Sequence, residues 1–156
     1  MIMYLTEHFN VYEMCKSETA LRKGIDNSPT EHIIENLTIL CQNVLEPVRA
    51  AFNAPVKVNS GYRSPDVNQA VGGSRNSDHT RGMAADIEIP GLPNYDLAVW
   101  IAGNLQFTQL ILEFYTPGVP DSGWVHVSYD PKNLKCQTLT AVRISGKTIY
   151  ENGLRQ

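Results

Sequence analysis

Residues 77–86 read Ser77-Asp78-His79-Thr80-Arg81-Gly82-Met83-Ala84-Ala85-Asp86, and they indicate both the architecture and the chemistry of this chain. They offer an imidazole, His79, and a carboxylate, Asp86. Trp124-Val125-His126 adds a second imidazole inside a short apolar run. Two neutral imidazoles and one carboxylate are ligands that zinc accepts in a tetrahedral site with one open position. If these three side chains converge, the chain holds a catalytic metal ion.

The two segments have the alternating pattern of strands that line a site. In a strand over 84–89, Asp86 shares a face with Ala84, whose small side chain leaves space for an ion and a substrate. In a strand over 124–129, His126 shares a face with Trp124, opposite the apolar valines. A lone histidine or aspartate in a strand more often has a structural role than a ligand role. The occurrence of all three as a set favours a metal site.

The surrounding sequence predicts helices first and strands afterwards. Apolar residues recur at three- and four-residue spacing over 30–52, which predicts an amphipathic helix that Pro47 could interrupt. The other expected elements are a short helix capped by Ser17, a strand over 56–60, a short helix over 64–71, a helix over 94–105, a strand over 108–115 and a hairpin over 138–150. This order predicts an α+β fold, with N-terminal helices packed on a mainly antiparallel sheet, in one domain over 1–156.

Composition excludes several classes of protein. The formal net charge of −3 over 156 residues lacks the basic excess of a nucleic-acid-binding surface. The three cysteines form no CxxC pair, so we expect free thiols. No apolar stretch reaches membrane-spanning length, and Glu7 and His8 interrupt the N-terminus before the apolar core of a signal peptide could form. We therefore expect cytoplasmic synthesis without a signal peptide and without membrane insertion.

Glu113 is the candidate general base. It interrupts the apolar run of residues 110–115, and a buried carboxylate must be paired, placed at a metal site or protonated. Partial burial would raise its pKa toward the working pH. An eight-residue loop joins this strand to residues 124–129, so antiparallel pairing would bring Glu113 near His126. A solvated position at the sheet edge is the alternative.

Arg63 is the candidate substrate-binding cation. It follows a strand end within Ser60-Gly61-Tyr62-Arg63-Ser64-Pro65, and a guanidinium group in such a loop suits a carboxylate. Arg75 and Arg81 flank the same region and could share this task. A surface arginine that caps a helix or pairs with Asp66 is the structural alternative.

In these residues the chain resembles the M15 zinc peptidases, which include D-alanyl-D-alanine carboxypeptidases and phage endolysin peptidases. The likeness rests on Ser77-x-His79-x-x-Gly82-x-Ala84-x-Asp86 and Trp124-x-His126. It is most similar to the small phage- and prophage-associated branch, through the segments 60–64 and 72–74. Further matches upstream extend the likeness over residues 8–129; they are Phe9, Arg22, Gly24-Ile25-Asp26-Asn27 and Leu45-Glu46-Pro47-Val48-Arg49.

The resemblance implies zinc held by His79, Asp86 and His126 on a fold of the hedgehog/D-Ala-D-Ala peptidase type. It implies hydrolysis of peptide bonds in the peptidoglycan stem peptide or cross-link, by a carboxypeptidase or an endopeptidase. Ser77 and Arg63 match family positions that bind the substrate and stabilise its carbonyl oxygen or carboxylate.

One position departs from the family pattern. Many relatives carry the catalytic glutamate three residues before the last histidine, where this chain has Gly123. We expect Glu113 to act as the base instead, with Asp121 as the second candidate and Glu88 as the third.

Two other functions remain open. One is a catalytically inactive, metal-stabilised domain that binds the cell wall or forms part of a virion. The other is a structural calcium or magnesium site, which two histidine ligands disfavour. For the enzyme we expect a monomer whose partner is a peptidoglycan peptide rather than nucleic acid, reaching the wall after release or by virion delivery.

Overall fold

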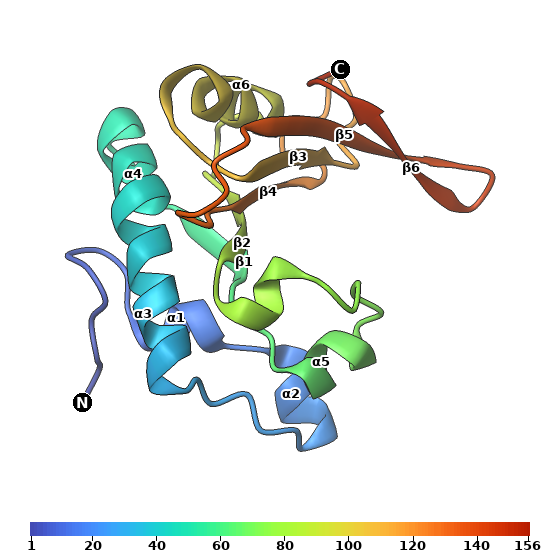
Figure 1. The fold of residues 1–156 in the computed structure, drawn as a ribbon. Coiled ribbons are helices and arrows are strands. Elements are labelled where there is room, and N and C mark those ends of the chain that lie inside the picture. The colour runs from blue at the N-terminus through green and yellow to red at the C-terminus, as the bar shows by residue number, and fades with distance from the viewer.

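A six-stranded sheet forms the centre of the fold (Figure 1). The computed structural model describes residues 1–156. Its strands are β1 (Lys57–Ser60), β2 (Ala84–Glu88), β3 (Gln109–Glu113), β4 (Trp124–Ser128), β5 (Gln137–Ile144) and β6 (Lys147–Asn152), in the order β1-β2-β4-β3-β5-β6. Only β3 and β5 pair in parallel. The predicted α+β class with a mainly antiparallel sheet is confirmed.

The helix predicted over 30–52 is present but contains a wider turn. It consists of α3 (Glu31–Leu40), a π-helical turn η1 (Cys41–Leu45) and α4 (Glu46–Phe52), with Pro47 in the first turn of α4. Proline has no N–H, and its ring crowds the preceding turn of an α-helix. A π turn directly before Pro47 relieves that crowding, so the helix continues where the sequence suggested an interruption.

The two faces of the sheet differ in chemistry because side chains alternate along each strand. One face is apolar: Ala85, Ile87, Leu110, Val125 and Val127 are fully buried. They belong to the hydrophobic core together with residues of α3, α4 and α6 (Asn94–Asn104). The opposite face carries the polar residues of β2, β3 and β4, so the helices leave this second face free for a functional site.

Short helices and turns complete the N-terminal half. They are α1 (Val11–Cys15), α2 (Glu18–Lys23), α5 (Pro65–Ala70) and the 3-10 helix η2 (Asp78–Arg81). Ser17 caps α2 by accepting a hydrogen bond from the Ala20 N–H, as predicted. Helix α1 was not expected; Asn10 and Glu13 form its capping box. All three cysteines are free, and no helix has the length and apolar character needed to cross a membrane.

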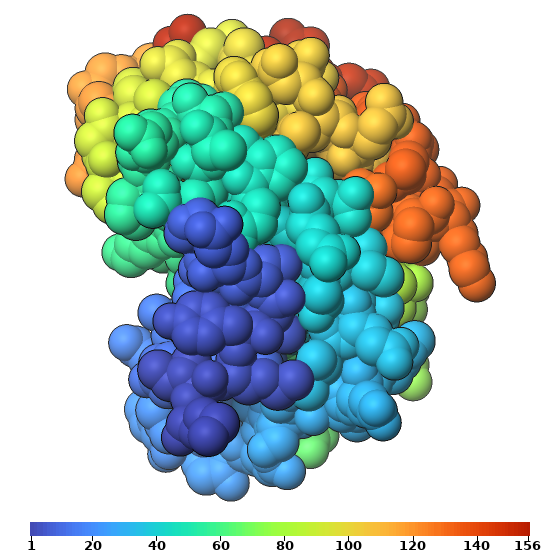
Figure 2. Space-filling view, turned by 90° about the vertical axis from the view of Figure 1, so that its left-hand side faces the viewer, coloured from blue at the N-terminus to red at the C-terminus, as the bar shows by residue number.

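The first residues of the chain run along the long helix rather than toward the polar face of the sheet. Figure 2 shows this segment, in dark blue, against the cyan and teal surface of α3 and α4. Glu46 of α4 anchors it, because its carboxylate accepts hydrogen bonds from the Thr6 hydroxyl at 2.7 Å and the His8 N–H at 2.8 Å.

The predicted hairpin at the C-terminal end is confirmed as β5 and β6. Ser145 and Gly146, at φ +51° and +77°, form the tight turn between them. In Figure 1 the hairpin projects to the right of the sheet. Helix α5 and the loop after it lie below the hairpin in this view.

Candidate active site

The three expected metal ligands meet on the polar face of the sheet. His79 comes from η2, Asp86 from β2, and His126 from β4, where it pairs directly with Asp86 across the strands. Asp86 Oδ1 lies 3.3 Å from His79 Nε2 and 3.0 Å from His126 Nδ1. The three ligand atoms lie within 4.8 Å of one another, so this cluster could hold a metal ion.

The spacing of these atoms fits a small tetrahedral ion. Bonds of 2.0–2.2 Å from zinc to nitrogen and oxygen place tetrahedral ligand atoms about 3.3–3.6 Å apart. The distances of 3.3 Å and 3.0 Å to Asp86 Oδ1 are close to this range. An ion could therefore be accommodated with only small movements of the side chains.

A backbone hydrogen bond fixes the orientation of His79. Its Nδ1–H donates to the carbonyl oxygen of Gly61 at 2.7 Å, and its side chain is only 2% exposed. A neutral imidazole carries one N–H, so Nε2 keeps its lone pair toward Asp86 and His126. The Gly61 backbone is itself confined, since a Cβ there would lie 2.3 Å from the Met14 carbonyl oxygen. These contacts therefore fix the orientation of the ligand atom of His79, Nε2.

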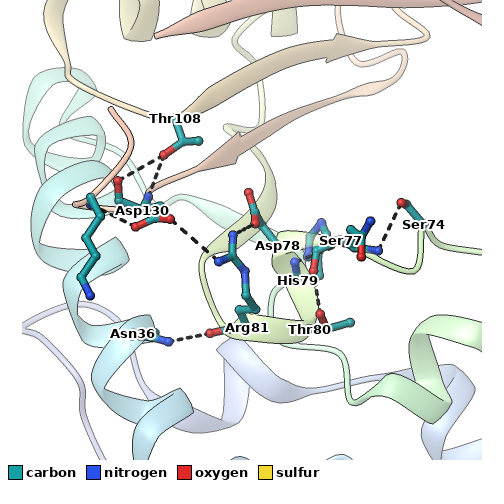
Figure 3. A network of polar contacts seen from close by, with 11 residues as sticks. Asn36, Ser74, Ser77, Asp78, His79, Thr80, Arg81, Thr108 and Asp130 are labelled. Carbon is teal, nitrogen blue, oxygen red and sulfur yellow. Dashed lines mark hydrogen bonds and ion pairs between the residues drawn. The ribbon is translucent and has the colours of Figure 1, made fainter. Parts of the chain in front are cut away.

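Polar contacts hold the short helix that carries His79 (Figure 3). Ser77 caps it, and its hydroxyl oxygen accepts a hydrogen bond from the His79 N–H at 3.2 Å. From α3, the Asn36 amide donates to the Arg81 carbonyl oxygen at 2.8 Å. Gly82 ends the helix at φ +69°, where a Cβ would lie 3.0 Å from the Ile33 carbonyl oxygen. The glycine of the motif is therefore needed for backbone conformation and packing.

The ionised carboxylate of Asp86 places a negative charge at the centre of the cluster. Burial disfavours the charged form of Asp86, but the charges and hydrogen bonds of His79 and His126 outweigh it and hold the pKa of Asp86 far below its ordinary value. Burial also disfavours charged His126, yet the hydrogen bond and charge of Asp86 raise its pKa. A cation is therefore favoured among these groups, and a metal ion would displace a proton to occupy the site.

Glu113 lies beside the cluster, as the expected strand pairing requires. β3 and β4 pair antiparallel, with Glu113 opposite Trp124 and Ile111 opposite His126. Glu113 is thus the diagonal neighbour of His126 on the same face, within reach of a long side chain. Burial and the charge of Asp86 raise its pKa, while His126 and Arg63 lower it. The indole N–H of Trp124 also lowers this pKa, without forming a well-aligned hydrogen bond.

Gly123 has a packing role that excludes any side chain. It has φ +64°, and a Cβ at this position would lie 1.9 Å from the Glu113 carbonyl oxygen. The Asn94 amide donates to the carbonyl oxygens of Ser122 and Gly123 at 2.9 and 3.2 Å, which fixes the backbone from the other side. An acidic residue cannot occupy position 123 without displacing the end of β3.

The other two candidate bases lie away from the cluster. Asp121 is exposed in the turn before β4, and it does not line the cavity that holds the three ligands. Glu88 also lies outside that cavity; its carboxylate accepts a hydrogen bond from the Asn59 amide at 2.7 Å. Of the three carboxylates considered, only Glu113 lines the cavity.

Only one of the three candidate arginines lines the same cavity. Arg63 donates its backbone N–H to the His79 carbonyl oxygen at 3.1 Å, and its buried Nε has no hydrogen-bond partner. Arg81 is paired with Asp78 and lies 3.8 Å from Asp130. Arg75 is exposed outside the cavity. The idea that Arg75 and Arg81 share the task of Arg63 is therefore not supported, because Arg75 lies outside the cavity and Arg81 is already paired.

All the central residues line one open cavity of about 500 Å³. The three ligands line it together with Glu113, Arg63 and Ser77. Arg143 and Tyr150 of the hairpin also line it, and the sequence did not single them out. Alternation along β5 could have placed Arg143 on one face, but the parallel pairing of β5 with β3 is a long-range contact that no local pattern gives.

Comparison with known proteins agrees with this geometry. The family model described as Peptidase M15 matches residues 7–128, most of the chain, and this span includes His79, Asp86, Glu113 and His126. The search of curated proteins gives no match. M15 peptidases depend on a metal, and the cluster of two histidines and an aspartate could bind one. The chain belongs to the M15 peptidase family and is a peptidase of the metallopeptidase kind.

Proposed function

We propose that this protein is a zinc-dependent peptidoglycan peptidase that hydrolyses peptide bonds of the stem peptide or cross-link. The observation that carries the proposal is one cavity in which His79, Asp86 and His126 adjoin a carboxylate, Glu113, and a half-buried arginine, Arg63, whose buried Nε has no hydrogen-bond partner. Metal ligands, a base and a cation for developing negative charge are the groups that peptide hydrolysis requires.

The donor set supports zinc as the metal. Calcium and magnesium prefer all-oxygen sites, whereas two imidazole nitrogens and one carboxylate suit zinc. The hydrogen bond from His79 to Gly61 is the kind of outer contact that orients a metal-binding histidine. When bound, zinc supplies an electrophile that polarises the peptide carbonyl and acidifies a water molecule.

Glu113 acts as the general base in this mechanism. Its carboxylate takes the proton of the attacking water and delivers it to the departing amine. Its raised pKa brings its proton affinity closer to what proton transfer near neutral pH requires. Burial is the largest cause of this increase, so the base depends on its partly enclosed position in the cavity.

Arg63 and Ser77 bind the substrate. The Arg63 guanidinium faces negative charge from Asp86 and Glu113, and its buried Nε is free to donate. It stabilises the oxyanion that develops at the scissile carbonyl, or a carboxylate of the substrate. The Ser77 oxygen accepts from the His79 N–H, so its own O–H remains available to a substrate carbonyl.

The choice of peptidoglycan rests on the resemblance to the phage- and prophage-associated branch of the family. On this proposal the protein works as a monomer, binds no nucleic acid, and reaches the cell wall after release or by virion delivery. The cationic side chains in the cavity, Arg63 and Arg143, suit the carboxylates that stem peptides carry.

The competing proposal is an inactive domain that binds the wall or forms part of a virion. Gly123 is the observation that favours it, because the position where many relatives carry their acid has no side chain. The two proposals make opposite predictions for Glu113, since an inactive domain has no use for a base.

Glu113→Gln tests them directly, with Glu88→Gln and Asp121→Asn as matched controls. Purified peptidoglycan is digested, the released fragments are analysed by mass spectrometry, and the metal content of each variant is measured. We expect E113Q to retain zinc and to lose about 10²- to 10⁴-fold in rate, while E88Q and D121N stay active. Activity of E113Q at the wild-type rate refutes the base. Wall binding without cleavage in every form supports the inactive domain. The fragments also distinguish a terminal from an internal cut.

A further inference from the structure

The cavity extends from the metal cluster to the C-terminal hairpin. Glu113 of β3 pairs with Ala141 of β5, which in turn pairs with Tyr150 of β6. Arg143, two residues after Ala141, lies on the same face and opposite Thr148. Arg143, Thr148 and Tyr150 all line the cavity that holds the ligands. The hairpin therefore forms one wall of the candidate active site.

Arg143 is a cation with no carboxylate partner. It takes part in none of the ion pairs of the structure. Its guanidinium carbon lies 5.1 Å from the centre of the Phe114 ring, which packs edge-on against Trp124 at 5.5 Å. Stacking on an aromatic ring holds the guanidinium in place and leaves its N–H groups free to donate.

Phe114 is positioned for this contact by an unusual backbone conformation. It has φ +58°, in the left-handed region, directly after β3 ends at Glu113. The same residue adjoins Gly123, whose missing side chain makes room for the backbone of Glu113 and Phe114. The turn that places the base thus also places the ring on which Arg143 rests.

Arg143 lies several substrate residues away from the metal cluster. From His126 the path crosses β3 to Leu139 of β5, two strand spacings or about 10 Å, and then runs four residues or about 13 Å along β5. The two Cα atoms are thus about 16 Å apart in this estimate. An extended peptide advances about 3.3–3.6 Å per residue, so Arg143 meets a substrate about four to five residues from the bond that is cut.

We propose that Arg143, resting on Phe114, forms a specificity subsite for a carboxylate of the substrate peptide, remote from the bond that is cut. This subsite rests on the proposed peptidase function and deepens it. Its cation, Arg143, lies beyond residue 128, where the match to the family ends, whereas Phe114 lies within the matched span. The hairpin thus selects peptides that carry free carboxylates over peptides in which these groups are amidated.

The test uses two synthetic stem peptides that differ only in having carboxylates or carboxamides at their side positions. Arg143→Gln removes the cation and keeps much of the side-chain length. Lys147→Ala is the matched control, because it removes a positive charge from the same hairpin outside the cavity. Both positions are exposed, so neither change disturbs the core.

We expect R143Q to raise KM about 3- to 10-fold for the carboxylate peptide with kcat unchanged, a modest effect because the arginine is exposed. The amidated peptide shows no such change, and K147A leaves KM for both peptides unaltered. Equal effects of R143Q on both peptides, or no effect on either, overturn the proposal. An effect of R143Q that is seen with glycan-bearing peptidoglycan fragments but with neither synthetic peptide also overturns it, because the subsite would then bind sugar.

Binding measured without hydrolysis separates this proposal from the peptidase function. The affinities of E113Q and of E113Q/R143Q for the two peptides are compared by calorimetry. Preference for the carboxylate peptide that disappears with Arg143 supports the subsite, even if the wild-type protein cleaves neither peptide and the proposed function fails. Absence of any preference in E113Q refutes the subsite, even if the wild-type protein is an active peptidase.

Discussion

Replacing Gly123 with alanine places a methyl group where the backbone at the end of β3 already lies. The new Cβ would be 1.9 Å from the Glu113 carbonyl oxygen and 2.8 Å from the Phe114 carbonyl carbon. Both neighbours are backbone atoms, so no side chain can rotate to relieve the contact. Relief requires the segment that carries the proposed base to move.

Two costs add in this variant. Gly123 has φ +64°, and a left-handed conformation costs about 1–2 kcal/mol for a residue with a Cβ. Overpacking against a backbone that cannot yield costs about 1–3 kcal/mol more. We therefore expect Gly123→Ala to lower the free energy of unfolding by about 2–5 kcal/mol, which corresponds to a fall in Tm of about 4–20 °C for a chain of this size.

Gly118→Ala separates the two costs. Gly118 lies in the same loop at φ +86°, and a Cβ there would meet nothing within 4 Å. It therefore reports the conformational cost alone. Urea denaturation of both variants gives the difference, which we expect to exceed 1 kcal/mol, and G123A also loses peptidase activity because Glu113 is displaced. Equal stabilities and equal activities of G123A and G118A would refute the packing argument for Gly123.

Further predictions concern two carboxylates. Because burial raises the pKa of Glu113, and the base works only when deprotonated, kcat/KM falls with decreasing pH through a value above the ordinary 4.5; a rate that stays constant down to pH 4.5 contradicts this role. Burial disfavours the charged form of Glu46, but hydrogen bonds from Thr6 and His8 prevail and lower its pKa. Glu46→Gln should therefore cost about 1–2 kcal/mol in urea denaturation at pH 7. Because the pKa of Glu46 is lower in the folded state than in the unfolded state, that difference is complete above about pH 4.5 and disappears as the pH falls through the folded value; a difference independent of pH would contradict it.

Local patterns in the sequence were enough to predict much of the arrangement of the candidate site residues. Alternation placed Asp86 and His126 on open strand faces, and the structure pairs these two residues directly across β2 and β4. The short loop between β3 and β4 correctly indicated antiparallel pairing, which brings Glu113 diagonal to His126. These predictions succeeded because strand periodicity and loop length are properties of neighbouring residues.

Features that depend on distant contacts could not be predicted in this way. The hydrogen bond from His79 to Gly61 joins residues 18 positions apart, and nothing in either segment indicates it. The packing of Gly123 against Glu113 depends on how β3 ends, and the parallel pairing of β3 with β5 brings Arg143 to the cavity. The continuation of the long helix past Pro47 depends on a π turn that no spacing of apolar residues shows.

Zinc content measured on matched histidine variants tests the central claim most directly. His79→Ala and His126→Ala each remove one proposed ligand, whereas His32→Ala removes an exposed histidine of α3, 78% accessible and outside the cavity. Each purified protein is equilibrated with zinc, dialysed and analysed by mass spectrometry for metal. We predict about one zinc ion per chain in the wild type and in H32A, and far less in H79A and H126A. A wild-type protein without zinc, or full zinc retention in H79A and H126A, would contradict the account.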